Sequence, residues 1–194
     1  MESTDAALNT AADDNGGAYY TFETWELSSL LSEDMSTNPG WLTEGDWDWG
    51  TPTGGGGQYG NPDPVGGHTG STVYGYNLNG DYPNNLSERD LITSAIDCSD
   101  ATGTLLGFWR WLGVERNTYD HASIRISTNG STWNTVWENP DVEIADNGWI
   151  YQEFDISAFA DGYSTVYIKW VMGSTDGGWT YCGWNIDDVE IFSS

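Results

Sequence analysis

Apolar and polar side chains alternate along short stretches of this chain, which is the pattern of β-strands with one buried face. In the clearest stretch, TLLGFWRWLGV, one face carries Leu106, Phe108 and Leu112, and the other carries Trp109 and Trp111. A single helical turn is expected at 156–160. We predict roughly ten strands, at 30–35, 41–50, 73–78, 91–96, 104–114, 122–127, 132–138, 149–156, 165–172 and 185–192.

Turn-forming residues separate these stretches. The chain has 25 glycines, and Asn129-Gly130 is a hairpin signal. Short strands joined by glycine-rich turns predict an all-β fold, an antiparallel two-sheet β-sandwich of the jelly-roll type. The longest loop is expected at 51–70; loops of this length tend to be functional or mobile, and this one is placed to cover the sheet.

The N-terminal part has a different composition. Residues 1–17 are small, polar and acidic, which is typical of a flexible tail or linker. Residues 18–28 are aromatic and strand-like, and could pair with the sheet edge of a neighbouring molecule. We therefore divide the chain into 1–29, a tail with an assembly strand, and 30–194, a β-sandwich domain.

The charge of the chain is strongly negative. Thirty Asp and Glu residues against five Lys and Arg residues give a net charge of −25. Binding of nucleic acid or anionic lipid requires basic patches, so both are excluded as partners. No apolar run approaches the ~18 residues of a membrane span, so no membrane insertion is expected. Aromatic residues make up 14% of the chain, which is enough to build a core and argues against an acidic disordered chain.

The chain has two cysteines, Cys98 and Cys182. Without a CxxC motif and with few histidines, a zinc site is disfavoured. We predict a disulfide between them, which requires an oxidising, extracellular setting; two buried thiols are the alternative. No signal peptide begins at Met1, so this setting implies that a leader was removed or not included.

Six segments occur in an order and spacing typical of one family of modules. They are GGHTGSTVYGY (66–76), NGDYPNNL (79–86), LITSAIDC (91–98), LLGFWRWLGVE (105–115), YDHASIRISTNGSTW (119–133) and GWNIDDVEIF (183–192). From Leu30 onward the chain resembles MAM-type jelly-roll modules, especially the bacterial type appended to secreted hydrolases such as immune-inhibitor-type metallopeptidases. The resemblance implies a two-sheet sandwich, a non-catalytic accessory role and, often, a bound structural cation.

The last predicted strand carries Asp187 and Asp188 among apolar residues. Buried carboxylates need a counter-charge, and the basic residues are too few to supply it. Ca²⁺, which takes oxygen ligands, is the expected solution, and the resemblance implies that it ties the first strand and a loop to the last strand. Glu33, Asp34 and Asp81 are the expected partners. Alternatively, Asp187 and Asp188 accept backbone N–H bonds at the strand end.

Trp109 and Trp111 are expected on the face opposite Phe108, where they could stack on sugar rings or anchor a protein partner. The alternative is that the loop 51–70 or the N-terminal segment covers them. Asp120-His121 has the composition of a general base with its orienting carboxylate, but the chain has no GxSxG or HExxH motif to complete a catalytic site. We therefore expect a hydrogen-bonded structural histidine there, and likewise at His68.

Together these features predict a non-catalytic extracellular module for adhesion or targeting, with a structural calcium ion and a protein or polysaccharide partner. One alternative is a structural subunit of an extracellular fibre or surface layer that assembles through residues 18–28. Another is a polysaccharide-acting enzyme with two catalytic carboxylates.

Overall fold

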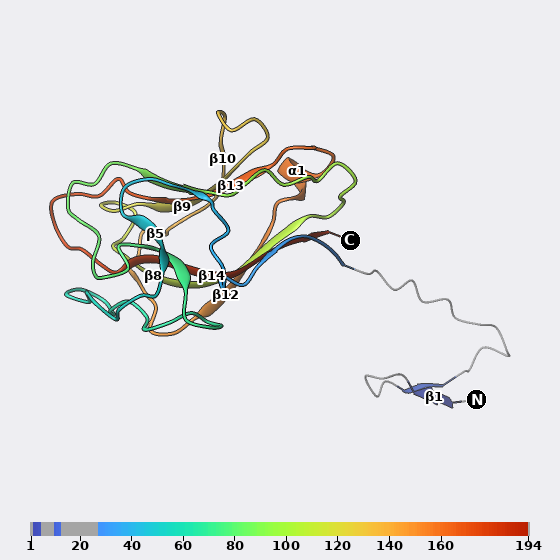
Figure 1. Cartoon of the computed structure of the whole chain (residues 1–194), viewed down its shortest axis with the longest axis horizontal. Helices are drawn as coiled ribbons and strands as arrows, with labels where there is room; N and C mark the ends of the chain where they lie inside the picture. The colour runs from blue at the N-terminus through green and yellow to red at the C-terminus, as the bar shows by residue number, and fades with distance from the viewer. Residues whose placement is uncertain (1, 5–9, 13–26, 194) are drawn as a thin grey trace.

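Two antiparallel sheets pack face to face in the computed structural model, which describes residues 2–4, 10–12 and 27–193. Figure 1 shows the two layers, with β9, β10 and β13 in one and β8, β12 and β14 in the other. The predicted fold class, an all-β antiparallel two-sheet sandwich, is confirmed by this strand pairing.

The smaller sheet has five strands in the order β10-β9-β13-β7-β4. Both strands at its centre, β9 and β13, are almost entirely buried. The β9–β10 hairpin turns at the predicted Asn129-Gly130, where Gly130 has a φ of +71°. The strands span Leu42–Thr43 (β4), Arg89–Ile92 (β7), Ala122–Ser127 (β9), Asn134–Glu138 (β10) and Tyr167–Met172 (β13).

The larger sheet has seven strands, with the order β11-β8-β14-β6-β5 and with β12 beside β8 and β3 beside β14. The strands span Ser28–Glu33 (β3), Trp47–Gly50 (β5), Val73–Tyr76 (β6), Leu105–Val114 (β8), Ile144–Ala145 (β11), Ile150–Asp155 (β12) and Gly183–Ser193 (β14). At one end of the sheet Ser28 pairs with Ser193, so the first and last residues of the sandwich lie side by side.

Every predicted strand range from residue 30 onward overlaps a strand of the structure, and the predicted turn at 156–160 contains α1 (Ser157–Ala160). The two-residue β11 has no counterpart among the predicted ranges. Among the described residues, no helix is long and apolar enough to cross a membrane.

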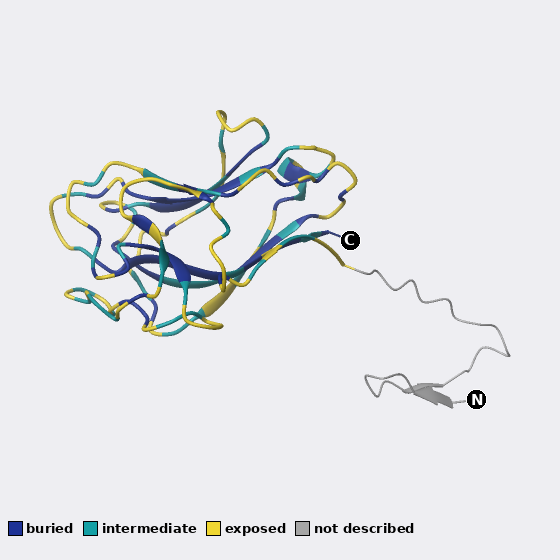
Figure 2. Ribbon diagram, viewed as in Figure 1, coloured by how far each residue is buried: buried dark blue, intermediate teal, exposed yellow. Residues whose placement is uncertain are grey.

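Aromatic side chains fill the space between the sheets. Trp170 of β13 meets Phe108 of β8 edge-on, with ring centroids 5.4 Å apart, and stacks on Trp41 at 5.7 Å. Trp184 of β14 packs edge-on against Trp137 of β10 at 5.6 Å. Figure 2 shows that buried residues lie along the strands of both layers. Such pairs join the sheets by apolar burial and ring geometry together.

The outer face of the larger sheet is covered by residues 51–70, here called the covering loop. Its backbone carbonyl at Pro62 accepts a hydrogen bond from Trp111 Nε1 at 3.1 Å. Its His68 ring stacks on Trp109 with centroids 3.6 Å apart. The loop therefore forms a third layer over β8 and β14.

The N-terminal part contains one pair of short strands, β1 (Glu2–Thr4) and β2 (Thr10–Ala12). Residues 18–26 of the predicted assembly segment 18–28 lie outside the described residues, so the role of this segment in self-assembly stays a prediction. β3 begins at Ser28, which places the predicted boundary between residues 29 and 30 inside a strand.

The predicted disulfide is not formed: Cys98 and Cys182 are both free, buried thiols. Cys182 immediately precedes β14, whereas the neighbours of Cys98 line a pocket with Ser193 at the far end of β14. A strand of this length spans ~35 Å, and a disulfide requires Cα atoms within ~7 Å. The alternative of two buried thiols describes the structure.

Candidate functional site

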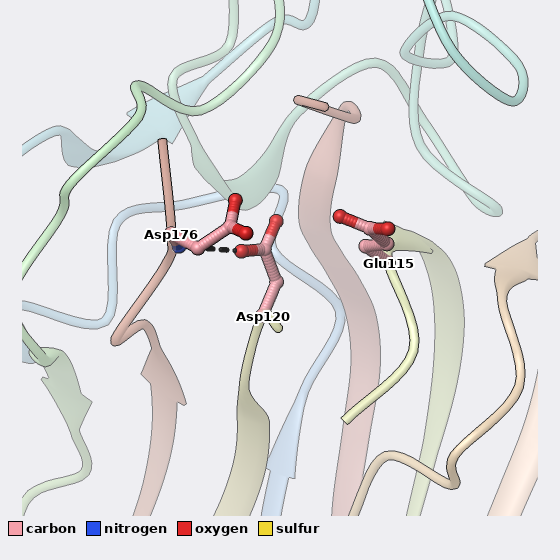
Figure 3. Close-up of side chains that lie close together, drawn as sticks. All are labelled: Glu115, Asp120 and Asp176. Atoms are coloured by element: carbon pink, nitrogen blue, oxygen red, sulfur yellow. Dashed lines mark hydrogen bonds between the residues drawn. The ribbon is translucent and has the colours of Figure 1, made fainter. Parts of the chain in front are cut away.

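Three carboxylates meet at one end of the sandwich (Figure 3). Glu115 follows the last residue of β8, Asp120 lies two residues before β9, and Asp176 lies in the connection from β13 to β14. Each can present an oxygen within 4.8 Å of the others. Among the described residues this is the group of acidic, histidine or cysteine side chains whose spacing suits a metal ion.

Asp120 is the fixed member of the group. Its side chain is fully buried, and Oδ2 accepts a hydrogen bond from the Tyr82 hydroxyl at 2.6 Å. Oδ1 accepts one from the backbone N–H of Asp176 at 2.8 Å. Burial raises the pKa of Asp120, these two bonds lower it in part, and the nearby Asp176 carboxylate raises it further. Both connecting segments are thereby tied to one buried carboxylate.

Glu115 is the member with no partner. It is only 9% exposed, and its carboxylate has no hydrogen bond or ion pair in the described part of the chain. Its pKa is raised first by burial and then by the charges of Asp120 and Asp176, and Arg116 offsets little of this. Glu115 lines the surface pocket described below, and its two like-charged neighbours favour a cation or a proton on this group.

The donor set fits a hard cation. Carboxylate oxygens at this spacing are the ligands that Ca²⁺ prefers, and Asp176 is the more exposed member, which leaves one side open to solvent. A bound Ca²⁺ would supply the missing counter-charge to Glu115. The residues present thus fit a hard cation, and the calcium ion predicted from the sequence, at other residues, stays a prediction.

The acidic group opens into a surface pocket of about 400 Å³, here called the acidic pocket. Its aromatic walls are Tyr119, which is 46% exposed, and Trp179, which is 51% exposed. Tyr59 of the covering loop stacks on Trp179, with centroids 4.9 Å apart. Trp179 is therefore held in place by one ring face while a large part of it stays open to solvent.

The five carboxylates predicted to hold calcium are not gathered into one group. Asp34 Oδ1 accepts hydrogen bonds from the Ser36 backbone and hydroxyl, at 2.9 and 2.6 Å. Asp81 accepts them from the backbone N–H groups of Gly57 and Gln58. Glu33 lies on β3, opposite Val189 of β14, where burial and Asp34 raise its pKa.

Asp187 and Asp188 instead bind the covering loop. Asp187 Oδ2 accepts a hydrogen bond from the Thr69 backbone at 3.0 Å. Asp188 Oδ1 accepts one from the Thr69 hydroxyl at 2.6 Å, and its Oδ2 lies 2.6 Å from His68 Nδ1. A β-bulge in β14 between Asp187 and Glu190 turns both carboxylates toward the loop. Donors from the protein itself thus surround the pair, in mid-strand rather than at the strand end.

The predicted ligand platform, Trp109 and Trp111, is half-buried under the covering loop. Besides the contacts with His68 and Pro62, Trp111 meets Trp149 edge-on at 6.1 Å. The outer placement of both tryptophans opposite Phe108 is as expected, and the loop occupies the space in which a ligand would stack.

The sequence pattern does not show which acids form the acidic group, although it offers Trp179, with Tyr181 and Trp184, as a second candidate aromatic patch before the last predicted strand. It singles out Asp120 only as a neighbour of His121, and no hydrogen bond joins these two side chains in the structure. The available signal is an acid directly after one apolar strand, at Glu115, and another shortly before the next strand, at Asp120. The third acid, Asp176, is far away in the sequence and is brought in by the β13–β9 pairing.

Comparison with known proteins gives one sequence relative. No protein-family model matches the chain. Bacillopeptidase F of Bacillus subtilis (strain 168) is 28% identical over 170 residues, which are 85% of this chain and 11% of that protein. The chain thus spans about a tenth of the length of the relative that it matches.

Three solved structures that resemble the chain have sequence identities of 15% or less to it. The K3 cleaved adhesin domain of Lys-gingipain from Porphyromonas gingivalis W83 has a TM-score of 0.49 and 15% identity, covering 86% of this chain and all of that one. The xylan-binding domain from CBM 22 has a TM-score of 0.48 and 10% sequence identity, and the match covers 85% of this chain and 94% of that one. The C-terminal CBM6 of LamC, a laminarinase from Zobellia galactanivorans, has a TM-score of 0.45 and 15% sequence identity, and the match covers 87% of this chain and all of that one. The resemblance to MAM-type modules in particular stays a prediction.

Proposed function

We propose that the chain is a non-catalytic extracellular binding module that carries Ca²⁺ in the acidic pocket and takes a polysaccharide against Trp179. The observation that carries this proposal is the half-exposed Trp179 ring, fixed by its stack on Tyr59, beside a carboxylate group that lacks a counter-charge. Exposed, rigid aromatic rings beside polar groups are suited to stacking on sugar rings.

The arrangement of the acids supports a binding role over a hydrolytic one. Both oxygens of Asp120 are bonded, to the Tyr82 hydroxyl and the Asp176 backbone, and its side chain is fully buried. The Asp120 carboxylate is therefore held inside the protein and cannot reach the glycosidic oxygen of a bound sugar. The match of this chain to about a tenth of bacillopeptidase F agrees with a module that belongs to a larger protein.

The residues of the acidic pocket have two proposed roles, ion binding and ligand binding. Glu115, Asp120 and Asp176 would hold the ion, which supplies positive charge that fixes the two connecting segments relative to each other. Tyr119 and Trp179 form the walls against which the ligand packs. Because Asp176 belongs to the same connection as Trp179, an ordered ion site also orders the ligand-binding wall.

Affinity gel electrophoresis against a panel of soluble polysaccharides, in CaCl₂ and in EDTA, tests the proposal. We expect at least one polysaccharide to retard the wild-type protein in calcium, with retardation weakened in EDTA and in Glu115→Gln. Trp179→Ala should weaken binding by roughly 5- to 150-fold, since loss of one stacked ring costs about 1–3 kcal/mol.

Tyr163→Ala is the matched control, because Tyr163 is equally exposed at 51% and lies by α1, in another part of the sandwich. It should bind as the wild type does. Retardation that survives Trp179→Ala would place the ligand elsewhere. No retardation by any polysaccharide would overturn the carbohydrate assignment and leave a protein as the partner to be tested.

A further inference from the structure

The underside of the covering loop carries two buried oxygens that lack a hydrogen-bond donor. Asp63 of the loop is 2% exposed, and Asn185 of β14 is fully buried beneath it. Asn185 Nδ2 donates to Asp63 Oδ1 at 2.8 Å, but Asp63 Oδ2 and Asn185 Oδ1 have no donor. Buried acceptors without a partner are rare and costly, so two of them on contacting side chains indicate a missing positive group.

The backbone around Asp63 is fixed on both sides. Asn61 Nδ2 donates to the Ala145 carbonyl at 3.0 Å, and the Pro62 carbonyl accepts from Trp111 Nε1. The Asp63 N–H donates to the Gly55 carbonyl at 2.9 Å. The backbone of the loop therefore holds the Asp63 carboxylate against Asn185.

The residues of β6 pack closely against the Asn185 side chain. Gly75 of β6 pairs with Asn185, and a Cβ at Gly75 would lie 2.7 Å from Asn185 Oδ1 and 2.5 Å from a methyl carbon of Leu78. Only glycine leaves room for the amide to lie across β6. The amide oxygen is thus packed against the backbone of β6 at Gly75, beneath the covering loop.

Charge at this position is uncompensated. None of the ion pairs in the described part of the chain includes Asp63. Burial raises the pKa of Asp63 to about 7, the bond from Asn185 opposes this, and the Asp81 carboxylate adds to it. Asp81 also raises the pKa of the neighbouring buried thiol of Cys182, after burial and Asp63 itself, so the region as a whole is negative.

We propose that Asp63 Oδ2 and Asn185 Oδ1 are two ligands of a buried hard divalent cation of the Ca²⁺ class, at a site separate from the acidic pocket. Ca²⁺ takes 6–8 oxygen ligands, so the others come from backbone carbonyls of the covering loop and from water. The ion joins the loop to β14 and neutralises Asp63. A proton on Asp63 is the competing explanation, and it would act only below pH ~7.

The test uses the full chain with the acidic pocket disabled by Glu115→Gln and Asp176→Asn, which removes the other calcium site. In this parent we expect CaCl₂ at about a hundredfold excess over Kd to raise Tm by roughly 5–10 °C relative to EDTA. Adding Asp63→Asn should abolish the shift. The amide has the shape of a protonated acid, so if a proton is the natural partner this variant would match the parent with no calcium effect in either.

Asn185→Asp gives the opposite change. It adds a second carboxylate to the site, so Tm should fall in EDTA and rise in calcium by more than in the parent. Asp100→Asn, an exposed position, is the control and should keep the parent's calcium shift. Under the competing explanation Asn185→Asp would be destabilised in both conditions.

Tb³⁺ luminescence keeps the test decisive if Asp63→Asn does not fold. Trp111 contacts the residue beside Asp63, so it should sensitise Tb³⁺ bound there. We expect Tb³⁺ emission from the parent, displaced by Ca²⁺ and strongly reduced in Trp111→Phe. A parent with no calcium shift and no Tb³⁺ emission, or an Asp63→Asn protein that retains either, would overturn the site without affecting the acidic pocket.

Discussion

At the scale of single residues, the chain buries carboxylates that most proteins leave in water. Asp63, Asp120 and Asp187 are each at most 2% exposed. Each joins a loop to the rest of the sandwich: Asp63 of the covering loop bonds Asn185 of β14, Asp120 bonds the connection at Asp176, and Asp187 of β14 bonds Thr69 of the covering loop. The acids thus act as fixed acceptors that position loops on the sheets.

This burial predicts an unusual pH dependence. Burial raises the pKa of Asp187 to about 6, against hydrogen bonds from the Asp188 and Thr69 backbones that lower it. Because the folded pKa lies above the unfolded value of ~3.9, the folded state holds the proton more tightly. The stabilising contribution of this proton is complete below pH ~4 and is lost as the pH rises through 6. The free energy of unfolding falls by at most about 1.4 kcal/mol for each pH unit between these limits.

Urea unfolding of wild type and Asp187→Asn between pH 4 and 7, in EDTA, measures this contribution. As pH rises across the window, the unfolding free energy of the wild type should fall relative to that of Asp187→Asn, which has no carboxyl group to titrate at this position. Asp100→Asn, an exposed aspartate, should retain the wild-type slope. A wild-type slope in Asp187→Asn would contradict the assignment.

At the scale of elements, the covering loop depends on close backbone contacts. A Cβ at Gly67 would lie 2.2 Å from the Thr69 carbonyl oxygen and 2.5 Å from Asp187 Oδ2. Neither atom can move without breaking the attachment of the loop to β14. Gly67→Ala should therefore destabilise the protein by about 1–3 kcal/mol, as overpacking does elsewhere.

Gly148→Ala is the matched control, because a Cβ there meets no atom within 4 Å. Its unfolding midpoint in urea should equal that of the wild type. Protease sensitivity of residues 51–70 should rise in Gly67→Ala alone. An alanine tolerated at Gly67 would show that the loop is not held by Asp187.

The elements themselves were predictable because strand periodicity is local. The alternation around Phe108 and the hairpin at Asn129-Gly130 are visible in a few adjacent residues, and both are present in the structure. The two-residue β11 is too short for any period. The bulge at Asp188, with its φ of +46°, depends on the partner strand and so leaves no periodic signal.

The candidate site could be predicted only in kind. Acid-rich composition with few basic residues directs attention to carboxylates and calcium, and a carboxylate group is present. Which acids meet depends on sheet order: Asp176 reaches Asp120 because β13 pairs with β9, a contact between distant parts of the chain. The disulfide prediction is wrong for the same reason, since composition cannot show that Cys98 and Cys182 lie at opposite ends of β14.

At the scale of the whole molecule, negative charge dominates. The net charge is −25, and Arg110, Arg125 and Lys169 are already paired with acids. Most acidic side chains therefore repel one another, and this repulsion acts over a Debye length of ~30 Å at 0.01 M salt but only ~8 Å at 0.15 M.

Raising the salt concentration across that range should increase Tm by about 2–4 °C, which corresponds to ~1 kcal/mol for a protein of this size. Choline chloride with EDTA should give the same increase as NaCl with EDTA, because screening needs no coordination. An increase with NaCl alone would indicate bound sodium, and no increase with either salt would show that the acids are spaced too widely to repel.

The pairing of Ser28 with Ser193 has a mechanical consequence. The two ends of the sandwich therefore lie at the same end of the larger sheet, on the antiparallel neighbours β3 and β14. A pulling force applied across these ends breaks the hydrogen bonds between β3 and β14 one after another, starting at Ser28 and Ser193. It does not load all of these bonds at once, as a shearing force would. Force applied between Ser28 and Ser193 should therefore detach β3 first, while the aromatic core and the acidic pocket stay folded.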